Sequence, residues 1–582
     1  MDHLDSQRMR LIPSAIGEKS ALLLAALFTF PMFLFAAPLD PDFHHDGIQL
    51  AVAVAASEGL AIHRDVFSQY GPLTGQIQGG WLFLTEPTLY SLRILASIEL
   101  SICVLMVTLI GMRLKLPPFG AALLAISWGW LCPAWALPNQ PFTLLPWTSI
   151  DFLLLTLISA WLMLLEIASS KLCVPRILLA GVFMGMAFFS RPHIVAVFLL
   201  AWLVLGALTK GDLKSKGSVF FLYLVGVTSS CFVILIFLTL NGSFSAYVSD
   251  SLLGPAAAYP TMIVNKLQAY WLVGLLPLLL IYFPLMLQKN QFQRSVEIKA
   301  ASIIRILALT TLVIASFAPA FVSDSYLGGT NSDRLKLLAG MIQQSILLFA
   351  GLVILLFLID TVKKPHHEWT LLNSNIIEKA SEPETVRGQF MKLGVYVLAL
   401  ASLIQMYPQW DAYHLWWASP LALVVTGFLL RNLQFKELKI NRLFLVTVVI
   451  VGASGGFHQY HNLTAERTTW EISGILKGMK FEPEDYSVAV SIESFMKTYE
   501  DKVIDVECKD GIYSVWFGKY MNADSSFVSW AWQNRNTVEN YDRVLFCEKE
   551  QDLGIENFKK KGYEVVQKSE ELGFVWLLNQ RK

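Results

Sequence analysis

Charged residues are scarce in this chain. Asp, Glu, Lys and Arg make up 15% of the 582 residues, whereas a soluble chain of this length carries about 25%. The 45 basic residues are balanced by 45 acidic ones, so no overall basic field exists to attract nucleic acid. The scarcity of charge excludes an ordinary soluble enzyme, and the lack of net positive charge argues against a nucleic-acid partner.

Cysteine is also sparse, and its six copies divide by region. Four lie in or beside apolar runs, where a small buried hydrophobic residue is their ordinary role. Cys508 and Cys547 lie in the charged tail, where they either form a disulfide or remain two free thiols. The tail has no glycine-rich phosphate loop, which favours a structural or acceptor-handling role over independent catalysis.

What the chain has in abundance is long apolar runs between Ala21 and Gly456. Many are close to the roughly 20 residues that a helix needs to cross hydrocarbon. The predicted spans lie near 20–37, 92–112, 118–137, 145–165, 175–190, 194–209, 217–240, 270–287, 303–321, 343–361, 391–407, 413–430 and 442–457. The sequence therefore predicts a polytopic all-α membrane protein of about 13 transmembrane helices over 1–457, followed by a small C-terminal α/β domain over 458–582.

Basic residues gather in alternate loops, as in 289–299 and 363–387. Cytoplasmic loops carry the excess of Lys and Arg. The pattern predicts a cytoplasmic N-terminus, and it places both the first loop (38–91) and the C-terminal domain on the extracytoplasmic side.

The first loop spends about fifty residues where a simple connection needs only a few. Apolar residues recur at helical spacing over 47–57 and again over 73–84, and Gly59 follows the first run. Both runs predict short interfacial helices, with Trp81 suited to the headgroup level. A loop of this kind can hold a reactive group at the bilayer surface.

Asp46 stands immediately before the first of these helices. A carboxylate just outside the membrane can accept a proton from a hydroxyl or amine that attacks an activated sugar. An aspartate in this position is equally a common helix N-cap. Local sequence leaves both interpretations open.

The loop resembles the GT-C superfamily of membrane glycosyltransferases, which includes protein O-mannosyltransferases and lipid A aminoarabinose transferases. The matching pieces are Asp46-Gly47, Glu58-Gly59, Arg64-Asp65-Val66-Phe67, Tyr70-Gly71-Pro72-Leu73 and Leu92-Arg93-Ile94. The resemblance implies inverting transfer from a polyprenyl-phosphate-linked sugar, with Asp46 as general base. It also implies a lipid, glycan or protein acceptor and a multi-pass location in a bacterial plasma membrane.

A second similar stretch, 405–414, lies where relatives place groups around the lipid-phosphate donor. Similar aminoarabinose transferases carry basic residues where this chain has Gly71 and Gln49, so the donor phosphate must be bound from elsewhere. The predicted phosphate contacts are Arg191, Arg334 and His414, and the predicted substrate contacts are Asp65, Tyr70 and Asp411. The alternatives are a snorkelling Arg191, a solvated Arg334, and a His414 that merely pairs with Asp411.

No metal or other cofactor is expected. Asp40-Pro41-Asp42 beside two histidines is a weak signal for a divalent ion, because adjacent side chains rarely converge on one ion. The main rival function is a secondary transporter or lipid-linked-sugar flippase, although no inverted halves are evident. A membrane-anchored scaffold and an oligosaccharide ligase are further alternatives.

Overall fold

The computed structural model describes most of the first half of the chain and shorter parts of the second. The described residues are 2–43, 45–131, 144–167, 173–192, 213–253, 345–355, 412–430, 434–435, 438–464, a few short stretches between these, and parts of the tail from 466 to 580. Calls that fall on other residues lie outside this set.

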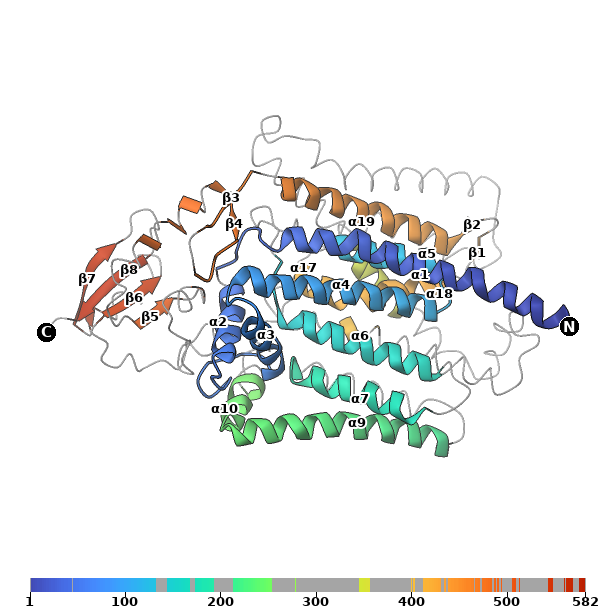
Figure 1. Ribbon diagram of the computed structural model, residues 1–582, viewed down its shortest axis with the longest axis horizontal. Coiled ribbons are helices and arrows are strands. Elements are labelled where there is room, and N and C mark those ends of the chain that lie inside the picture. Colours follow the sequence, from blue (N-terminus) through green and yellow to red (C-terminus); the bar gives the residue numbers. More distant parts are fainter. Residues whose placement is uncertain are drawn as a thin grey trace.

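Long helices lie side by side with nearly parallel axes and form the body of the molecule (Figure 1). They are α1 (Asp2–Ala36), α4 (Leu89–Arg113), α6 (Thr148–Ile167), α7 (Val174–Phe188), α9 (Leu213–Leu240) and α19 (Ile440–Thr464). Shorter α5 (Pro118–Trp130), α17 (Ala412–Ala418) and α18 (Pro420–Leu430) pack among them. Trp128 of α5 and Trp416 of α17 stack at 5.2 Å, and each indole donates to the other's backbone carbonyl, at 2.9 and 2.7 Å. These two reciprocal hydrogen bonds and the ring stacking join α5 to α17, so helices from the early and late parts of the chain share one core.

Several helices are apolar enough to cross a membrane. Within the described residues, four are long enough, namely Gly17–Ala36, Leu89–Arg113, Thr148–Glu166 and Gly217–Leu240, and four shorter apolar helices lie at Val174–Phe188, Ser345–Leu355, Pro420–Leu430 and Arg442–Phe457. Each of these coincides with a predicted span. The spans predicted near 194–209, 270–287 and 303–321 lie almost wholly outside the described residues. The prediction of several long apolar helices is therefore confirmed, while the count of about 13 transmembrane helices stays a prediction.

The two helices predicted in the first loop are present at one end of the bundle, as α2 (His45–Ser57) and α3 (Pro72–Leu84) (Figure 1). Gly59, at φ +85°, follows α2 in a conformation that other residues rarely adopt. Pro72 begins α3, where its missing N–H costs nothing.

The environment of α2 differs from the expected interfacial helix. Every residue from Asp46 to Ala55 is buried, because α3 and the apolar side chains of Trp470 and Phe481 belong to the same core cluster. Residues at the end of α3 keep the expected exposure, since Phe83 and Leu84 are 75% and 79% exposed. Of these two helices, α3 offers an exposed apolar surface at its end, while α2 is largely buried.

Strands and short helical turns complete the structure. Small antiparallel pairs form between β1 (Gln434–Phe435) and β2 (Leu438–Lys439), and between β3 (Thr468–Thr469) and β4 (Lys480–Phe481). A short α10 (Phe244–Tyr247) continues into a π-helical turn, η1 (Val248–Leu253). The tail holds a four-stranded sheet in the order β5-β6-β8-β7, with β5 (Asp505–Cys508), β6 (Arg543–Cys547), β7 (Tyr563–Lys568) and β8 (Val575–Gln580). This sheet lies beyond α2 and α3, at the opposite end of the molecule from the start of α1 (Figure 1).

The register of this sheet bears on the two tail cysteines. Strands β5 and β6 are parallel, and Cys508 and Cys547 are backbone partners in adjacent strands. Neighbouring strands lie about 4.8 Å apart, which is within the Cα separation that a disulfide allows. The disulfide stays a prediction that the register permits.

Close packing of α7 against α9 yields a test of the bundle. A Cβ at Gly181 would lie 2.1 Å from the Tyr223 carbonyl oxygen, so the helices touch backbone to backbone. We expect Gly181→Ala to destabilise the protein by about 1–3 kcal/mol through overpacking, seen as a lower unfolding midpoint in detergent. Gly217→Ala on α9, where a Cβ meets nothing within 4 Å, is the matched control. Equal midpoints for the two variants would contradict this packing.

Candidate functional site

The centre of the first loop is a buried ion pair between Asp46 and Arg93. Asp46 lies in the first turn of α2, Arg93 lies in the second turn of α4, and neither side chain is exposed. Arg93 Nε donates to Asp46 Oδ1 at 3.3 Å, and Arg93 Nη2 donates to Asp46 Oδ2. The backbone N–H of Asp42 donates to the same Oδ2 at 2.8 Å. The predicted catalytic carboxylate is therefore held by a cation that lies 47 positions away.

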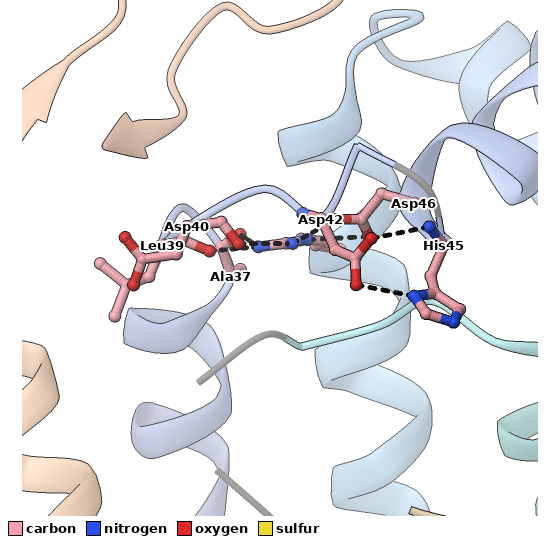
Figure 2. Close-up of polar contacts among 7 residues, drawn as sticks. Ala37, Leu39, Asp40, Asp42, His45 and Asp46 are labelled. Atoms are coloured by element: carbon pink, nitrogen blue, oxygen red, sulfur yellow. Dashed lines mark hydrogen bonds and ion pairs between the residues drawn. The ribbon is translucent and has the colours of Figure 1, made fainter. Parts of the chain in front are cut away.

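The same guanidinium also binds the turn that joins α1 to α2. It donates to the backbone carbonyls of Ala37 at 3.3 Å, Asp40 at 3.2 Å and Leu39 (Figure 2). Arginine offers five N–H donors in a rigid fork and is always charged. One side chain thus fixes the end of α1, the turn and the start of α2 relative to α4.

Burial and ion pairing act on Asp46 in opposite directions. Loss of solvent raises its pKa above that of an exposed aspartate, and the charge and hydrogen bonds of Arg93 lower it. Burial is the larger effect, so the pKa is raised overall. A carboxylate with a raised pKa is a stronger base than a surface aspartate, and the neighbouring cation favours its ionised form.

Asp42 and His45 form a second acidic contact beside this pair. Asp42 Oδ1 accepts the backbone N–H of His45 at 2.8 Å, and Asp42 Oδ2 lies 2.7 Å from His45 Nδ1 (Figure 2). The Asp42 side chain is 25% exposed and the His45 side chain is 43% exposed, whereas Asp46 is fully buried. The turn thus carries a solvent-facing acid–imidazole pair next to a buried carboxylate.

A row of aromatic rings leads from His45 to Arg191. The His45 ring meets the edge of Trp147 at 5.4 Å, Trp147 meets Tyr70 at 5.4 Å, and the Arg191 guanidinium lies 5.7 Å from the centroid of the Tyr70 ring. The structure thereby brings three predicted site residues, Asp46, Tyr70 and Arg191, into one continuous region.

Polar groups around Arg191 are buried and incompletely paired. Arg191 is 1% exposed and donates to Ser149 Oγ at 2.5 Å. Its Nε, Trp147 Nε1 and the hydroxyls of Thr148 and Ser190 are buried with no hydrogen-bond partner among the described residues. Buried donors are normally satisfied, so a buried guanidinium with an unpaired Nε, next to the unpaired Ser190 hydroxyl, is a candidate anion site.

Position 71, where the sequence resemblance leads one to expect a basic residue, has room only for glycine. A Cβ at this position would lie 1.8 Å from the backbone oxygen of Phe189. Gly71 N–H donates to Ser190 O at 3.2 Å, and Leu73 N–H donates to Phe189 O at 3.1 Å. A basic side chain cannot occupy position 71, and the turn that excludes it carries Arg191.

The remaining predicted residues lie elsewhere or outside the described set. Asp65 accepts two hydrogen bonds from Arg64, at 2.8 and 2.7 Å, and one from the Ala61 N–H at 2.8 Å, which lower its pKa. These contacts give Asp65 a local role in the loop. His414 lies on α17, where its ring centroid is 5.4 Å from that of Trp417. Arg334 and Asp411 lie outside the described residues.

The Asp-x-Asp stretch does not converge on one point. Asp40 pairs with Arg467, and Asp42 pairs with His45. Among the described residues, no group of three potential ligands is placed to hold a metal ion. The expectation of no metal cofactor stays a prediction.

Sequence reasoning missed the role of Arg93, which it treated only as part of a motif. A signal was present, because an arginine at the start of an apolar span is costly without an acidic partner. Arg93 begins the span that directly follows the first loop, so the acidic residues of that loop were the natural candidates for its partner.

No family model matches the sequence, and no curated protein matches it. The fold is similar to that of ArnT from Cupriavidus metallidurans bound to undecaprenyl phosphate, at 10% identity over 96% of this chain and 97% of that one, with a TM-score of 0.42. It is also similar to archaeal oligosaccharyltransferase AglB from Archaeoglobus fulgidus in complex with an inhibitory peptide and a dolichol-phosphate, at 12% identity over 91% and 69% of the two chains, with a TM-score of 0.44.

The buried pair yields a test that does not depend on function. We expect Arg93→Met to destabilise the protein by about 3–5 kcal/mol, because it leaves a buried charge without its partner. The double variant Arg93→Met with Asp46→Asn removes both charges and should lose less than the two single losses combined. Unfolding in detergent measures the cycle, and strictly additive losses would show that the two groups do not interact.

Proposed function

We propose that this chain is a GT-C type membrane glycosyltransferase that moves a sugar from a polyprenyl-phosphate donor to an acceptor. The transfer takes place at the end of the helical bundle where α2 and α3 lie. The observation that carries the proposal is the Asp46–Arg93 pair, a fully buried carboxylate bound to a guanidinium next to the partly exposed Asp42 and His45. The motifs of the first loop support the same reaction class.

In this proposal Asp46 is the general base. The acceptor O–H or N–H attacks the anomeric carbon, the bond from that carbon to the phosphate oxygen breaks, and the acceptor proton passes to Asp46. The lipid phosphate departs with the bonding electron pair, so the step balances without an oxidant, a reductant or a second substrate. A single displacement inverts the anomeric centre, as the family resemblance implies.

Access to Asp46 requires movement of the turn above it. The carboxylate has no exposed surface, and the backbone N–H of the partly exposed Asp42 donates to it. We place acceptor entry on this side, because Asp42 and His45 are the partly exposed polar groups next to Asp46. Displacement of the turn by an acceptor would open a path to the base.

We assign the donor phosphate to the region of Arg191. Its guanidinium is buried and incompletely paired, and charge-assisted hydrogen bonds from such a group stabilise a departing phosphate. The turn that carries Arg191 lies against Gly71, where relatives have a basic residue, so Arg191 supplies a cation to the same neighbourhood from another element. Tyr70 lies under the guanidinium and is proposed to contact the substrate. His414, Arg334, Asp65 and Asp411 stay predictions.

We propose that the site faces the extracytoplasmic side, with the N-terminus in the cytoplasm. The positive-inside pattern supports this orientation. The start of α1 and the tail sheet lie at opposite ends of the bundle, and α2 and α3 lie at the end of the sheet (Figure 1), so one orientation accounts for the first loop and the tail together.

Asp46→Asn tests the base directly, since it keeps the shape of the side chain and removes its basicity. We expect purified protein in lipid to lose transfer from a panel of labelled polyprenyl-phosphate sugars by about 10²–10⁴-fold, the usual contribution of a general base, while donor binding is kept. Wild-type transfer should fall as pH is lowered through the raised pKa of Asp46, because the base works in its ionised form.

The matched control is Glu58→Gln, the same change at the exposed end of the same stretch. It should transfer at the wild-type rate. Equal rates for wild type and Asp46→Asn would reduce Asp46 to a structural cap. Failure of wild type to transfer from any donor would reject the proposed function.

Arg191→Met tests the phosphate site. It removes the charge and keeps much of the side-chain volume, so we expect donor affinity to fall by about tenfold or more, as the loss of a charge-assisted contact predicts. Binding of a labelled polyprenyl phosphate to protein in lipid measures the effect. Arg176→Met, at the other end of α7 where Arg176 pairs with Glu166 at 3.4 Å, should leave binding unchanged. Equal losses in both variants would remove Arg191 from the site.

A further inference from the structure

The chain that follows α19 returns to the first loop. We call residues 466–482 the strap; it contains β3 and β4 and is described except at positions 472 and 473. Lys480 N–H donates to Pro38 O at 2.6 Å, and Asp40 N–H donates to Lys480 O at 2.8 Å. Leu89 N–H donates to Ile475 O at 2.8 Å. The strap is therefore hydrogen-bonded to both ends of the first loop.

Apolar side chains hold the strap against α2. Trp470 and Phe481 are each 1% exposed and belong to the cluster that contains Leu50 and Ala53. Their rings lie 5.7 Å apart, and Phe481 meets Phe43 of the loop at 6.4 Å. The strap thus packs into the apolar cluster that contains most of the buried residues of α2.

A second buried ion pair joins the strap to the turn before Asp46. Arg467 Nε donates to Asp40 Oδ1 at 2.9 Å, and Arg467 Nη2 donates to Asp40 Oδ2 at 2.7 Å. The side chains are 3% and 1% exposed, although the two residues are 427 positions apart. A pair so deeply buried and so well aligned restricts both partners to one arrangement.

Asp40 is shared by the two ion pairs. Its carboxylate binds Arg467, and its backbone oxygen accepts from Arg93 Nη2 at 3.2 Å. Arg93 in turn holds Asp46. The order of contacts is Arg467, Asp40, Arg93, Asp46, and it leads from the strap to the proposed base without a gap.

We infer that Arg467 is a positioning residue for the transfer reaction: by fixing Asp40 it fixes the carbonyls that orient Arg93, and so the place of Asp46. This inference rests on the proposed function for its catalytic consequence. The strap is then part of the site, and the tail acts on the loop through defined contacts.

The test compares Arg467→Met and Arg467→Lys with Lys477→Met. Lys477 lies in the same strap and pairs with Glu86 at 3.1 Å, but both side chains are more than half exposed, so its removal controls for loss of one strap cation. Lysine at 467 keeps the charge without the two-pronged geometry, and it provides a milder variant if methionine prevents folding.

Two measurements are made on each full-length protein in lipid. Hydrogen exchange of the peptide 37–46 reports the position of the turn, and transfer kinetics report kcat and KM separately. We expect faster exchange of 37–46 and a kcat reduced by roughly 10²-fold in Arg467→Met, since small misplacement of a catalytic group costs about that much. Arg467→Lys should be intermediate, KM should change little, and Lys477→Met should match wild type.

Several results would overturn the inference. Unchanged exchange of 37–46 in both Arg467 variants would break the link between strap and loop. Faster exchange with an unchanged kcat would deny the positioning role, and an equal kcat loss in Lys477→Met would show that any damage to the strap has the same effect. If wild type transfers no sugar, the proposed function fails, and hydrogen exchange alone then decides whether Arg467 controls the turn.

Discussion

Burial of the Arg93 guanidinium is the constraint on which the site depends. A charged group without exposed surface must have its hydrogen bonds satisfied, because the cost of leaving it unpaired is several kcal/mol. Arg93 meets this requirement with the carboxylate of Asp46 and the carbonyls of Ala37, Leu39 and Asp40. Any displacement of the turn breaks several of these bonds at once, so the start of α2 is fixed to α4 and the proposed base has one position.

The cover over α2 makes that pair possible. An aspartate on a helix lying at the membrane surface would be solvated, and its pKa would stay near that of a free side chain. Here the strap packs Trp470 and Phe481 into the apolar cluster that contains Leu50 and Ala53 of α2, and burial raises the pKa of Asp46 at the start of the same helix. The tail thus contributes to the chemistry of the first loop even though its own sheet lies farther out.

Local sequence patterns predicted the helices of this region. They could not predict contacts between residues that are far apart in the sequence. Helical spacing gave α2 and α3 nearly to the residue, and Gly59 and Pro72 marked their ends as expected. The family resemblance singled out Asp46. Burial of α2 was missed because periodicity reports an apolar face without saying what covers it. Arg467 was missed because nothing in a single sequence links positions 427 apart.

Gly71 shows how a departure from the family pattern can be explained by packing. The absence of a basic residue before Pro72 looks like the loss of a phosphate contact when the loop is considered alone. In the structure the Phe189 carbonyl occupies the space that a side chain at 71 would need, and the turn that brings this carbonyl ends in Arg191. The backbone approach and the guanidinium therefore come from one turn. A side chain at 71 and the present turn at 189–191 are mutually exclusive, and the same turn carries the guanidinium that we propose binds the donor phosphate.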